Sequence, residues 1–195
     1  MLDILNKYRI ILASNSPRRK ELLEGMGLKF EVRVLPNIDE SYPDTLYGRE
    51  LPLYLARKKA RAYMPSLSSD ELLITADTVV HIGDEIILGK PKSHSEAKHM
   101  LRMLSDKTHE VTTGVALTTT AFQRDICETS HVTFAQLSEE EIEYYVSNFR
   151  PTDKAGAYGI QEWLGYIGVE KIVGSYFNVM GLPVHRLYRE LVSLG

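Results

Sequence analysis

The sequence has a single cysteine, Cys127, among 195 residues, so no disulfide can form within the chain. Such sparing cysteine usage is typical of a reducing compartment, and we expect a cytoplasmic protein. The first ten residues, MLDILNKYRI, have neither a long apolar core nor a small-residue cleavage site, so we expect no signal peptide. Uninterrupted apolar runs stay far below the ~18 residues that cross a bilayer, and we expect no membrane partner.

Positive charge is not in excess, because 23 Lys and Arg stand against 26 Asp and Glu, a formal net charge of −3. Duplex nucleic acid, which binds basic surfaces, is therefore not an expected partner. Neither a Walker P-loop nor a G-x-G-x-x-G loop occurs, and H-E-x-x-H and C-x-x-C zinc motifs are absent. Ser16 has no evident His and Asp companions, which argues against a serine triad.

The remaining composition, 44% hydrophobic and 25% charged residues, is that of an ordinary globular chain. Residue patterns predict strands at 9–13, 30–35, 72–80, 86–88, 111–119 and 126–134, with a turn at Gly83-Asp84. Caps and apolar spacing predict helices at 17–26, 49–64, 94–104 and 139–148 and a C-terminal helix from 183. Since strands and helices are mixed and some strands form hairpins, we expect an α/β fold with a mixed twisted sheet and flanking helices. No linker divides the chain, so residues 1–195 are interpreted as one domain with two lobes around a central cleft.

The first candidate site is the polar turn between the first predicted strand and helix, which holds Ser14, Ser16, Arg18 and Arg19. Free backbone N–H groups and the helix dipole favour an anion at such a turn, and arginine can hold phosphate oxygens bidentately. The ordinary alternative is a capped helix with solvated arginines. The loop alone leaves both interpretations open.

The second candidate is Asp77, because it interrupts the apolar run from 72 to 80. An unpaired buried carboxylate is costly, so Asp77 should have a partner, a metal or a place at the strand's end. The alternative is a carboxylate that makes local turn bonds with Thr78. Asp39 and Glu40 follow the second predicted strand and are interpreted as solvated unless they face Asp77, in which case the set suits Mg²⁺ or Mn²⁺.

Three lysines form a further candidate group. Lys59 borders the apolar face of the helix at 49–64, Lys90 follows a hairpin, and Lys154 precedes the small-residue run 155–161. Each alone is typical of a surface lysine, whereas together they could offset the charge of a polyphosphate. The run 155–161 permits close backbone approach to a flat ligand, where Gln161 could read a base edge; the alternative is a tight structural loop.

Several segments, taken together and in order, resemble those of one known family. They are Leu12–Leu23, Ala56–Ala60, Ala76–Val80, Gly89–Pro91, His109–Ala116, Asp153–Gln161 and Gly174–Pro183. On these segments the chain resembles the Maf-like proteins, nucleoside triphosphate pyrophosphatases related in fold to the inosine triphosphate pyrophosphatases. The segments cover nearly the whole chain, which is more specific than any one motif. One departure is Asn15, where the family often has glycine, and asparagine tolerates the same left-handed backbone.

The resemblance implies that a nucleoside triphosphate and water give the monophosphate and pyrophosphate, with a divalent cation (Mg²⁺ or Mn²⁺) as cofactor. It implies that Asp77 is the proton acceptor. Ser14, Arg18 and Arg19 match the family's phosphate-binding loop, Glu40, Lys59 and Lys90 match polar residues of its cleft, and Arg18, Thr78 and Gln161 match positions tied to base preference. The run Ala157–Gln161 is similar to the subfamily acting on dTTP and UTP, whereas a subfamily acting on 7-methyl-GTP lacks it.

Our hypothesis joins both lines of argument: the loop Ser14–Arg19 with Lys59 and Lys90 holds the triphosphate, and Asp77 with Glu40 holds the metal. One alternative is a pyrophosphatase that clears non-standard purine nucleotides. Another is a non-catalytic, nucleotide-binding regulator of cell division. A homodimer is an expected arrangement for cleft enzymes of this type.

Overall fold

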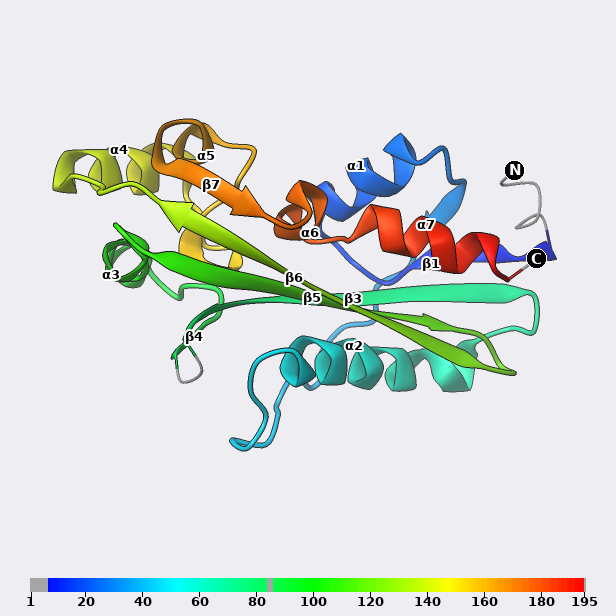
Figure 1. Cartoon of the computed structure of the whole chain (residues 1–195). Helices are drawn as coiled ribbons and strands as arrows, with labels where there is room; N and C mark the ends of the chain where they lie inside the picture. Colours follow the sequence, from blue (N-terminus) through cyan, green and yellow to red (C-terminus); the bar gives the residue numbers. More distant parts are fainter. Residues whose placement is uncertain (1–6, 84–85, 195) are drawn as a thin grey trace. The chain divides into compact units, whose positions relative to one another are not determined.

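The computed structural model describes residues 7–83 and 86–194, and their strands form one mixed sheet (Figure 1). The strands are β1 (Arg9–Leu12), β2 (Phe30–Val32), β3 (Glu71–Ile82), β4 (Ile86–Leu88), β5 (Thr108–Thr118), β6 (Gln123–Phe134) and β7 (Val169–Val173). Their order is β2-β1-β3-β5-β6-β7, with β4 paired to β3. β1 is parallel to β2 and β3, whereas β4 is antiparallel to β3 and β7 to β6. The predicted α/β fold with a mixed sheet is confirmed.

The helices agree with the sequence periodicity except in one segment. They are α1 (Pro17–Gly25), α2 (Glu50–Tyr63), α3 (His94–Leu104), α4 (Glu139–Phe149), α5 (Trp163–Gly168), α6 (Tyr176–Met180) and α7 (Val184–Val192), with 3₁₀ turns η2 (Met64–Ser66) and η3 (Ala155–Ala157). The elements η3, α5, β7 and α6 were not predicted, because each element between 151 and 180 is too short to show a helical or strand periodicity of apolar residues. Among the described residues no helix is both long and apolar enough to cross a bilayer.

The contacts divide the chain into two compact units. Unit 1 comprises Met1–Asp77, Thr113–Glu128 and Gly181–Gly195, and unit 2 comprises Thr78–Thr112 and Thr129–Met180. The strands β3, β5 and β6 each begin in one unit and end in the other. The interpretation of residues 1–195 as one domain with two lobes around a cleft stays a prediction.

In unit 1 the helix α2 covers one face of the sheet, and α1 and α7 lie on the other face (Figure 1). The predicted apolar stripe of α2 is buried, and Ala56, Ala60 and Tyr63 pack against Ile11 of β1 and Leu73 of β3. This contact follows from the two periods, because a helix stripe meets alternate residues of each strand. Because successive side chains of a strand point to opposite faces, the odd-numbered residues of β3 that follow Leu73 also face α2.

The strand β2 ends at Val32, three residues earlier than predicted. The hydroxyl of Tyr63 explains the difference, because it takes over the backbone groups that a longer strand would pair. It accepts a hydrogen bond from Leu35 N at 2.9 Å and donates one to Arg33 O at 3.0 Å. The chain after β2 is therefore tied to the end of α2 through Tyr63, while Arg33 N still donates to Leu12 O of β1 at 3.1 Å.

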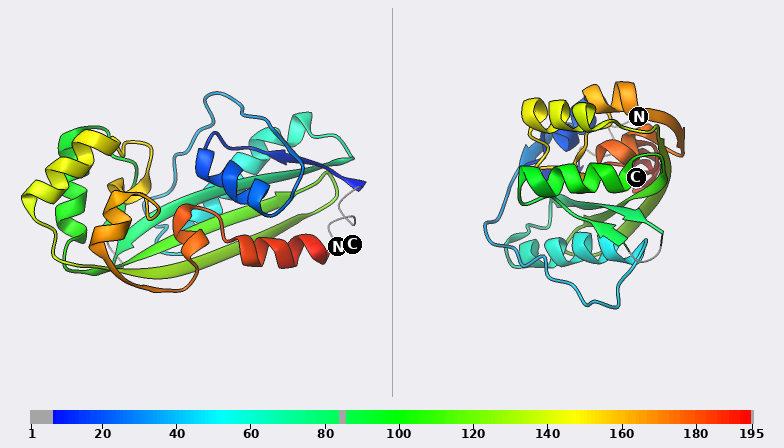
Figure 2. Two further views of the ribbon diagram at one scale, coloured as in Figure 1. Left: turned by 90° about the horizontal axis from the view of Figure 1, so that it is seen from above. Right: turned by 90° about the vertical axis from the view of Figure 1, so that its left-hand side faces the viewer.

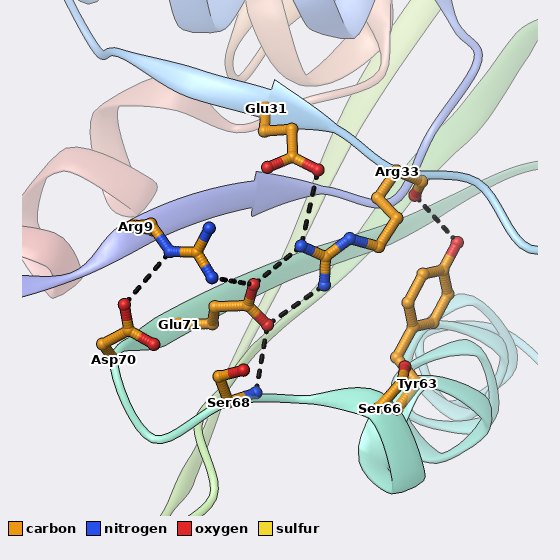
Figure 3. A network of polar contacts seen from close by, with 8 residues as sticks. All are labelled: Arg9, Glu31, Arg33, Tyr63, Ser66, Ser68, Asp70 and Glu71. Carbon is orange, nitrogen blue, oxygen red and sulfur yellow. Dashed lines mark hydrogen bonds and ion pairs between the residues drawn. The ribbon is translucent and has the colours of Figure 1, made fainter.

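A polar network holds together the three strands at the β2 edge of unit 1 (Figure 3). Glu71, at the start of β3, is only 1% exposed, and Arg33 donates to both of its carboxylate oxygens, at 2.7 and 3.0 Å. Arg9 of β1 donates to the same carboxylate at 2.8 Å, and Ser68 N at 3.1 Å. Hydrogen bonds from Arg33 hold the pKa of Glu71 near 2, well below its usual range.

Unit 2 is built from α3 and α4, which pack against each other (Figure 2, right), and from the segment between α4 and α6. The capping box predicted at Ser138 is complete, since Ser138 Oγ accepts from Glu141 N and the Glu141 carboxylate accepts from Ser138 N. The box predicted at Ser93 is only half formed, because Glu96 accepts from Lys92 N instead. At the predicted turn, Gly83 has a φ of 59°, and Asp84 lies outside the described residues.

Candidate active site

The turn between β1 and α1 is a closed, hydrogen-bonded loop in unit 1. Ser16 caps α1, as predicted: its Oγ accepts from Arg19 N at 3.4 Å, and Pro17 opens the helix. Ser14 is buried, and its Oγ accepts from Ser16 N at 3.2 Å. The two hydroxyls therefore fix the path of the backbone at the positive end of the helix dipole.

The Arg19 side chain is held by the protein, unlike the solvated arginines of the ordinary alternative. Its guanidinium donates to Gly181 O at 2.9 Å, to Ala76 O at 2.9 Å and to Ser14 Oγ at 3.4 Å. Burial lowers the pKa of Arg19, while the negative charge of Asp77 opposes this shift. An oriented, partly desolvated guanidinium beside the peptide that precedes Asp77 is suited to binding an anionic oxygen.

Asp77 has a cationic partner. The sequence predicted that Asp77 would have such a partner, a metal or a place at the end of its strand. Lys59 Nζ lies 2.5 Å from Asp77 Oδ1 and 3.1 Å from Glu40 Oε1. The side chains of Asp77 and Lys59 are 16% and 14% exposed, whereas Glu40 is 55% exposed. Asp77 does not lie at the end of its strand, because β3 continues to Ile82 in order to pair with β4. The structure thus brings two carboxylates to one ammonium group.

Lys59 reaches Asp77 because α2 lies very close to the sheet. Thr75, on the same strand face as Asp77, donates from Oγ1 to Ala56 O at 2.8 Å. Gly114 allows the approach at the start of α2, since a Cβ there would lie 2.4 Å from Leu53 N. The position of Lys59 therefore depends on contacts that α2 makes with Thr75 and Gly114, two residues far from Lys59 in sequence.

Asp39 and Glu40 are adjacent in sequence but bind different lysines. Asp39 accepts from Lys58 Nζ at 2.7 Å and from Ser41 N at 2.8 Å, and these hydrogen bonds hold its pKa near 2. Glu40 instead shares Lys59 with Asp77. Of the two loop carboxylates, Glu40 belongs to the candidate site and Asp39 does not.

The described residues contain no group of three or more His, Cys, Asp and Glu side chains placed to hold a metal. Asp77 and Glu40 are the predicted metal ligands, and this role stays a prediction.

Arg18, on α1 of unit 1, is half-buried beside Arg19 in sequence, whereas Thr78, Lys90, Lys154 and Gln161 belong to unit 2. Thr78 follows Asp77 on β3, and Lys90 is exposed just after β4. Lys154 is buried, and its Nζ lies 2.8 Å from Asp153 Oδ1 and 3.0 Å from Glu162 Oε1. Gln161 is half-buried, and its Oε1 accepts no hydrogen bond from the described part of the chain.

Sequence reasoning missed two residues that shape the segment carrying Lys154 and Gln161. The hydroxyl of Tyr145 donates to Glu162 Oε2 and accepts from Gly159 N at 3.0 Å. Glu162 was overlooked because it belongs to no motif or periodic pattern that would mark an acidic residue as buried or paired. Tyr145 follows the apolar spacing of its helix, which indicates burial but says nothing of the hydroxyl's partner.

Unit 1 therefore contains a serine-capped helix start with an oriented arginine, and near it two carboxylates that share one lysine. A family model described as "Maf-like protein" matches residues 9–194, so the chain belongs to the Maf-like protein family. The predicted family is confirmed.

Close relatives cover the whole chain. A protein from Phocaeicola vulgatus named dTTP/UTP pyrophosphatase is 60% identical over 194 residues, covering 100% of both chains. Proteins of the same name from Bacteroides thetaiotaomicron and Porphyromonas gingivalis are 57% and 55% identical, covering 100% of this chain and 100% and 98% of their own. A solved HAM1 protein from Coxiella burnetii aligns with a TM-score of 0.46 and 17% identity over 67% of this chain and 74% of that one.

Proposed function

We propose that this chain hydrolyses dTTP and UTP to the nucleoside monophosphate and pyrophosphate. The observation that carries the proposal is the cluster of Lys59, Asp77 and Glu40 near the Arg19 guanidinium, in a chain 55–60% identical to proteins named for this reaction. The reaction needs groups that bind phosphate oxygens and a base for water, and this cluster supplies both. As part of the same proposal, the enzyme acts in the cytoplasm.

The proposed binding of the triphosphate uses the donors around the β1–α1 turn. The side chains of Arg19 and Arg18 and the hydroxyl of Ser14 would hold phosphate oxygens at the positive end of α1. Lys59, whose side chain is only 14% exposed, would offset charge that develops on the leaving pyrophosphate. Lys90, Lys154 and Gln161 of unit 2 are proposed to bind the same substrate, on the strength of the family resemblance.

In the proposed chemical step Asp77 accepts a proton from the water that attacks the α-phosphorus. Its carboxylate is held by Lys59 Nζ at 2.5 Å, which orients it for this task. The bond from the α-phosphorus to the bridging oxygen then breaks, and pyrophosphate leaves with the electron pair. The guanidinium of Arg19, held by three protein oxygens, is pre-organised to stabilise the charge of the transition state.

The donor set fits a divalent cation as cofactor. Asp77 and Glu40 both contact Lys59 Nζ, so two hard carboxylate oxygens lie close to one point. Mg²⁺ is commonly bound by one or two carboxylates together with substrate phosphates, and this pair matches that requirement. When bound, Mg²⁺ or Mn²⁺ would act as a Lewis acid toward the phosphate oxygens.

The test is pyrophosphate release from dTTP, UTP, CTP, ITP, XTP and 7-methyl-GTP, with Mg²⁺, with Mn²⁺ and with a chelator. Metal-dependent turnover that is fastest on dTTP and UTP is the expected result. Faster turnover on ITP and XTP would favour a purine-clearing enzyme and contradict the base assignment. No turnover on any substrate, with binding retained, would favour a non-catalytic nucleotide-binding regulator.

A matched pair of variants separates the proposed site from its surroundings. Lys58 and Lys59 are neighbours on α2, but Lys58 contacts Asp39 and Lys59 contacts Asp77. Lys59→Met is expected to slow turnover by at least about tenfold, because it removes a charge-assisted contact. Lys58→Met is expected to stay within about twofold of the wild type. Equal losses in both variants would contradict the assignment.

A further inference from the structure

The segment 154–162 of unit 2 is fixed by a chain of buried polar contacts centred on one carboxylate. Glu162 receives Lys154 Nζ on one oxygen, at 3.0 Å, and the hydroxyl of Tyr145 on the other. Its side chain is 21% exposed, and that of Lys154 is 8% exposed. A carboxylate that holds a buried ammonium group and a buried phenol is a strong local anchor, because removing either partner leaves charge or polarity unpaired.

Tyr145, which binds Glu162, also binds the backbone in the middle of the segment. Tyr145 is fully buried on α4, and its oxygen accepts from Gly159 N at 3.0 Å while the hydroxyl donates to Glu162. A Cβ at position 159 would lie 2.8 Å from Glu162 Cδ, so a larger residue there would displace the carboxylate. Burial raises the pKa of the Tyr145 hydroxyl, so it stays protonated and able to donate at neutral pH.

The backbone on both sides of Gly159 is equally constrained. Gly156 has a φ of 69°, and a Cβ there would meet the Val80 side chain at 3.0 Å. At Gly165, in α5, a Cβ would lie 1.9 Å from Ile160 O. Residues with a side chain are therefore disfavoured at both positions, on either side of the Glu162 carboxylate.

Gln161 is the residue whose position these contacts constrain. It lies between Ile160, which is buried, and Glu162. Its Oε1 is buried, and no hydrogen-bond donor among the described residues reaches it. A buried acceptor without a protein partner is rare and needs a donor from water or from a ligand, and the N3–H of thymine or uracil is a donor of this kind.

We propose that Glu162, locked by Tyr145, is the positioning residue that sets the Gln161 amide for a pyrimidine base and so determines base preference. The proposal rests on the proposed function, because it names what specifies the substrate of that reaction. Glu162 acts through Gln161 and the backbone and does not touch the substrate. The carboxylate restrains Gln161 from the adjacent position, while its two partners restrain the segment at 154 and at 159.

The experiment is a double-mutant cycle on base preference, defined as kcat/KM for dTTP divided by kcat/KM for CTP, because cytosine has an acceptor at N3 where thymine has the N3–H donor. Tyr145→Phe and Glu162→Gln keep the shapes of the side chains and remove the hydroxyl or the charge. Each is expected to lower the preference by about tenfold, mainly through a higher KM for dTTP with kcat within about threefold. In the Gln161→Ala background the same substitutions should change the preference by less than about twofold.

Controls separate this role from general stability. Tyr144→Phe removes a hydroxyl from the exposed neighbour on α4, and Glu170→Gln removes an exposed charge from β7, so both should leave the preference unchanged. Thermal unfolding of every variant checks that it is folded at the assay temperature. If Glu162→Gln does not fold, Tyr145→Phe alone decides the question, since it keeps the carboxylate and the ring.

The outcomes are distinct. An unchanged preference in folded Tyr145→Phe overturns the proposal, and so does an effect that is equally large with and without Gln161. An equal loss on dTTP and CTP also overturns it, because that result describes a residue that supports the fold only. Absence of turnover in the wild type would contradict the proposed function instead, so failures of the two proposals are distinguishable.

Discussion

Replacing Glu71 by glutamine should destabilise unit 1 strongly although the residue lies outside the candidate active site. The carboxylate is 1% exposed and receives hydrogen bonds from Arg9, Arg33 and Ser68, which tie the start of β3 to β1 and to the chain after β2 (Figure 3). Glutamine keeps the size but offers one acceptor oxygen and no charge, so the two arginines lose their common counter-ion.

The magnitude follows from the pKa of Glu71, which is about 2 in the folded protein against 4.5 for the free side chain. At roughly 1.4 kcal/mol per pKa unit this difference corresponds to about 3 kcal/mol. Solvent screens the contribution of Arg9, whose side chain is 57% exposed, and we therefore expect about 2 kcal/mol. For a chain of this size, that loss lowers the melting temperature by roughly 4–8 °C.

Because the folded pKa is depressed, the stabilisation is fully present above about pH 4.5 and is lost as the pH falls toward about 2. Urea unfolding of wild type and Glu71→Gln at pH 7, 4 and 3 should show a difference that shrinks with acidity. Asp70→Asn is the matched control, since Asp70 is 56% exposed and pairs with the exposed Arg9, and it should cost less than about 1 kcal/mol. A Glu71→Gln protein within about 0.5 kcal/mol of wild type at pH 7 would refute the reasoning.

The remaining predictions concern the candidate site. Asp77→Asn should lower kcat by about 10²-fold or more while the far-UV circular dichroism is unchanged, and near-wild-type turnover would contradict the assignment of the base. Glu40→Gln should raise the Mg²⁺ concentration needed for half-maximal activity, whereas Asp39→Asn should not, and an equal shift in both would remove Glu40 from the site. Arg19→Lys should raise KM for dTTP by about tenfold, because a lysine cannot replace a guanidinium held by three oxygens; steady-state kinetics test this, and an unchanged KM would argue against phosphate binding there.

Much of the fold could be predicted because its local signals are strong. The serine-proline cap starts α1 where expected, and the apolar stripe of α2 is buried as its spacing indicated. The long strand signal around Asp77 was right as well, although the strand runs two residues further than predicted. The segment 151–180 could not be divided into elements from its sequence, because its path depends on glycines in close contact with distant groups, such as Gly156 against Val80.

The sequence by itself determined the family, the mixed sheet and the residue types of the candidate site. It also required that Asp77 have a partner, because a carboxylate inside an apolar strand is costly. It did not determine which partner. Only the tertiary structure assigned Lys59 to Asp77 and Glu40, and Lys58 to Asp39.

Three further contacts that the sequence could not specify were decided by the tertiary structure: Arg9 and Arg33 on Glu71, and Tyr145 on Glu162. The physical reason is common to all of these pairs. Helix and strand periods fix the face on which a side chain lies, but the group it meets depends on strand pairing and on the closeness of backbones far apart in sequence.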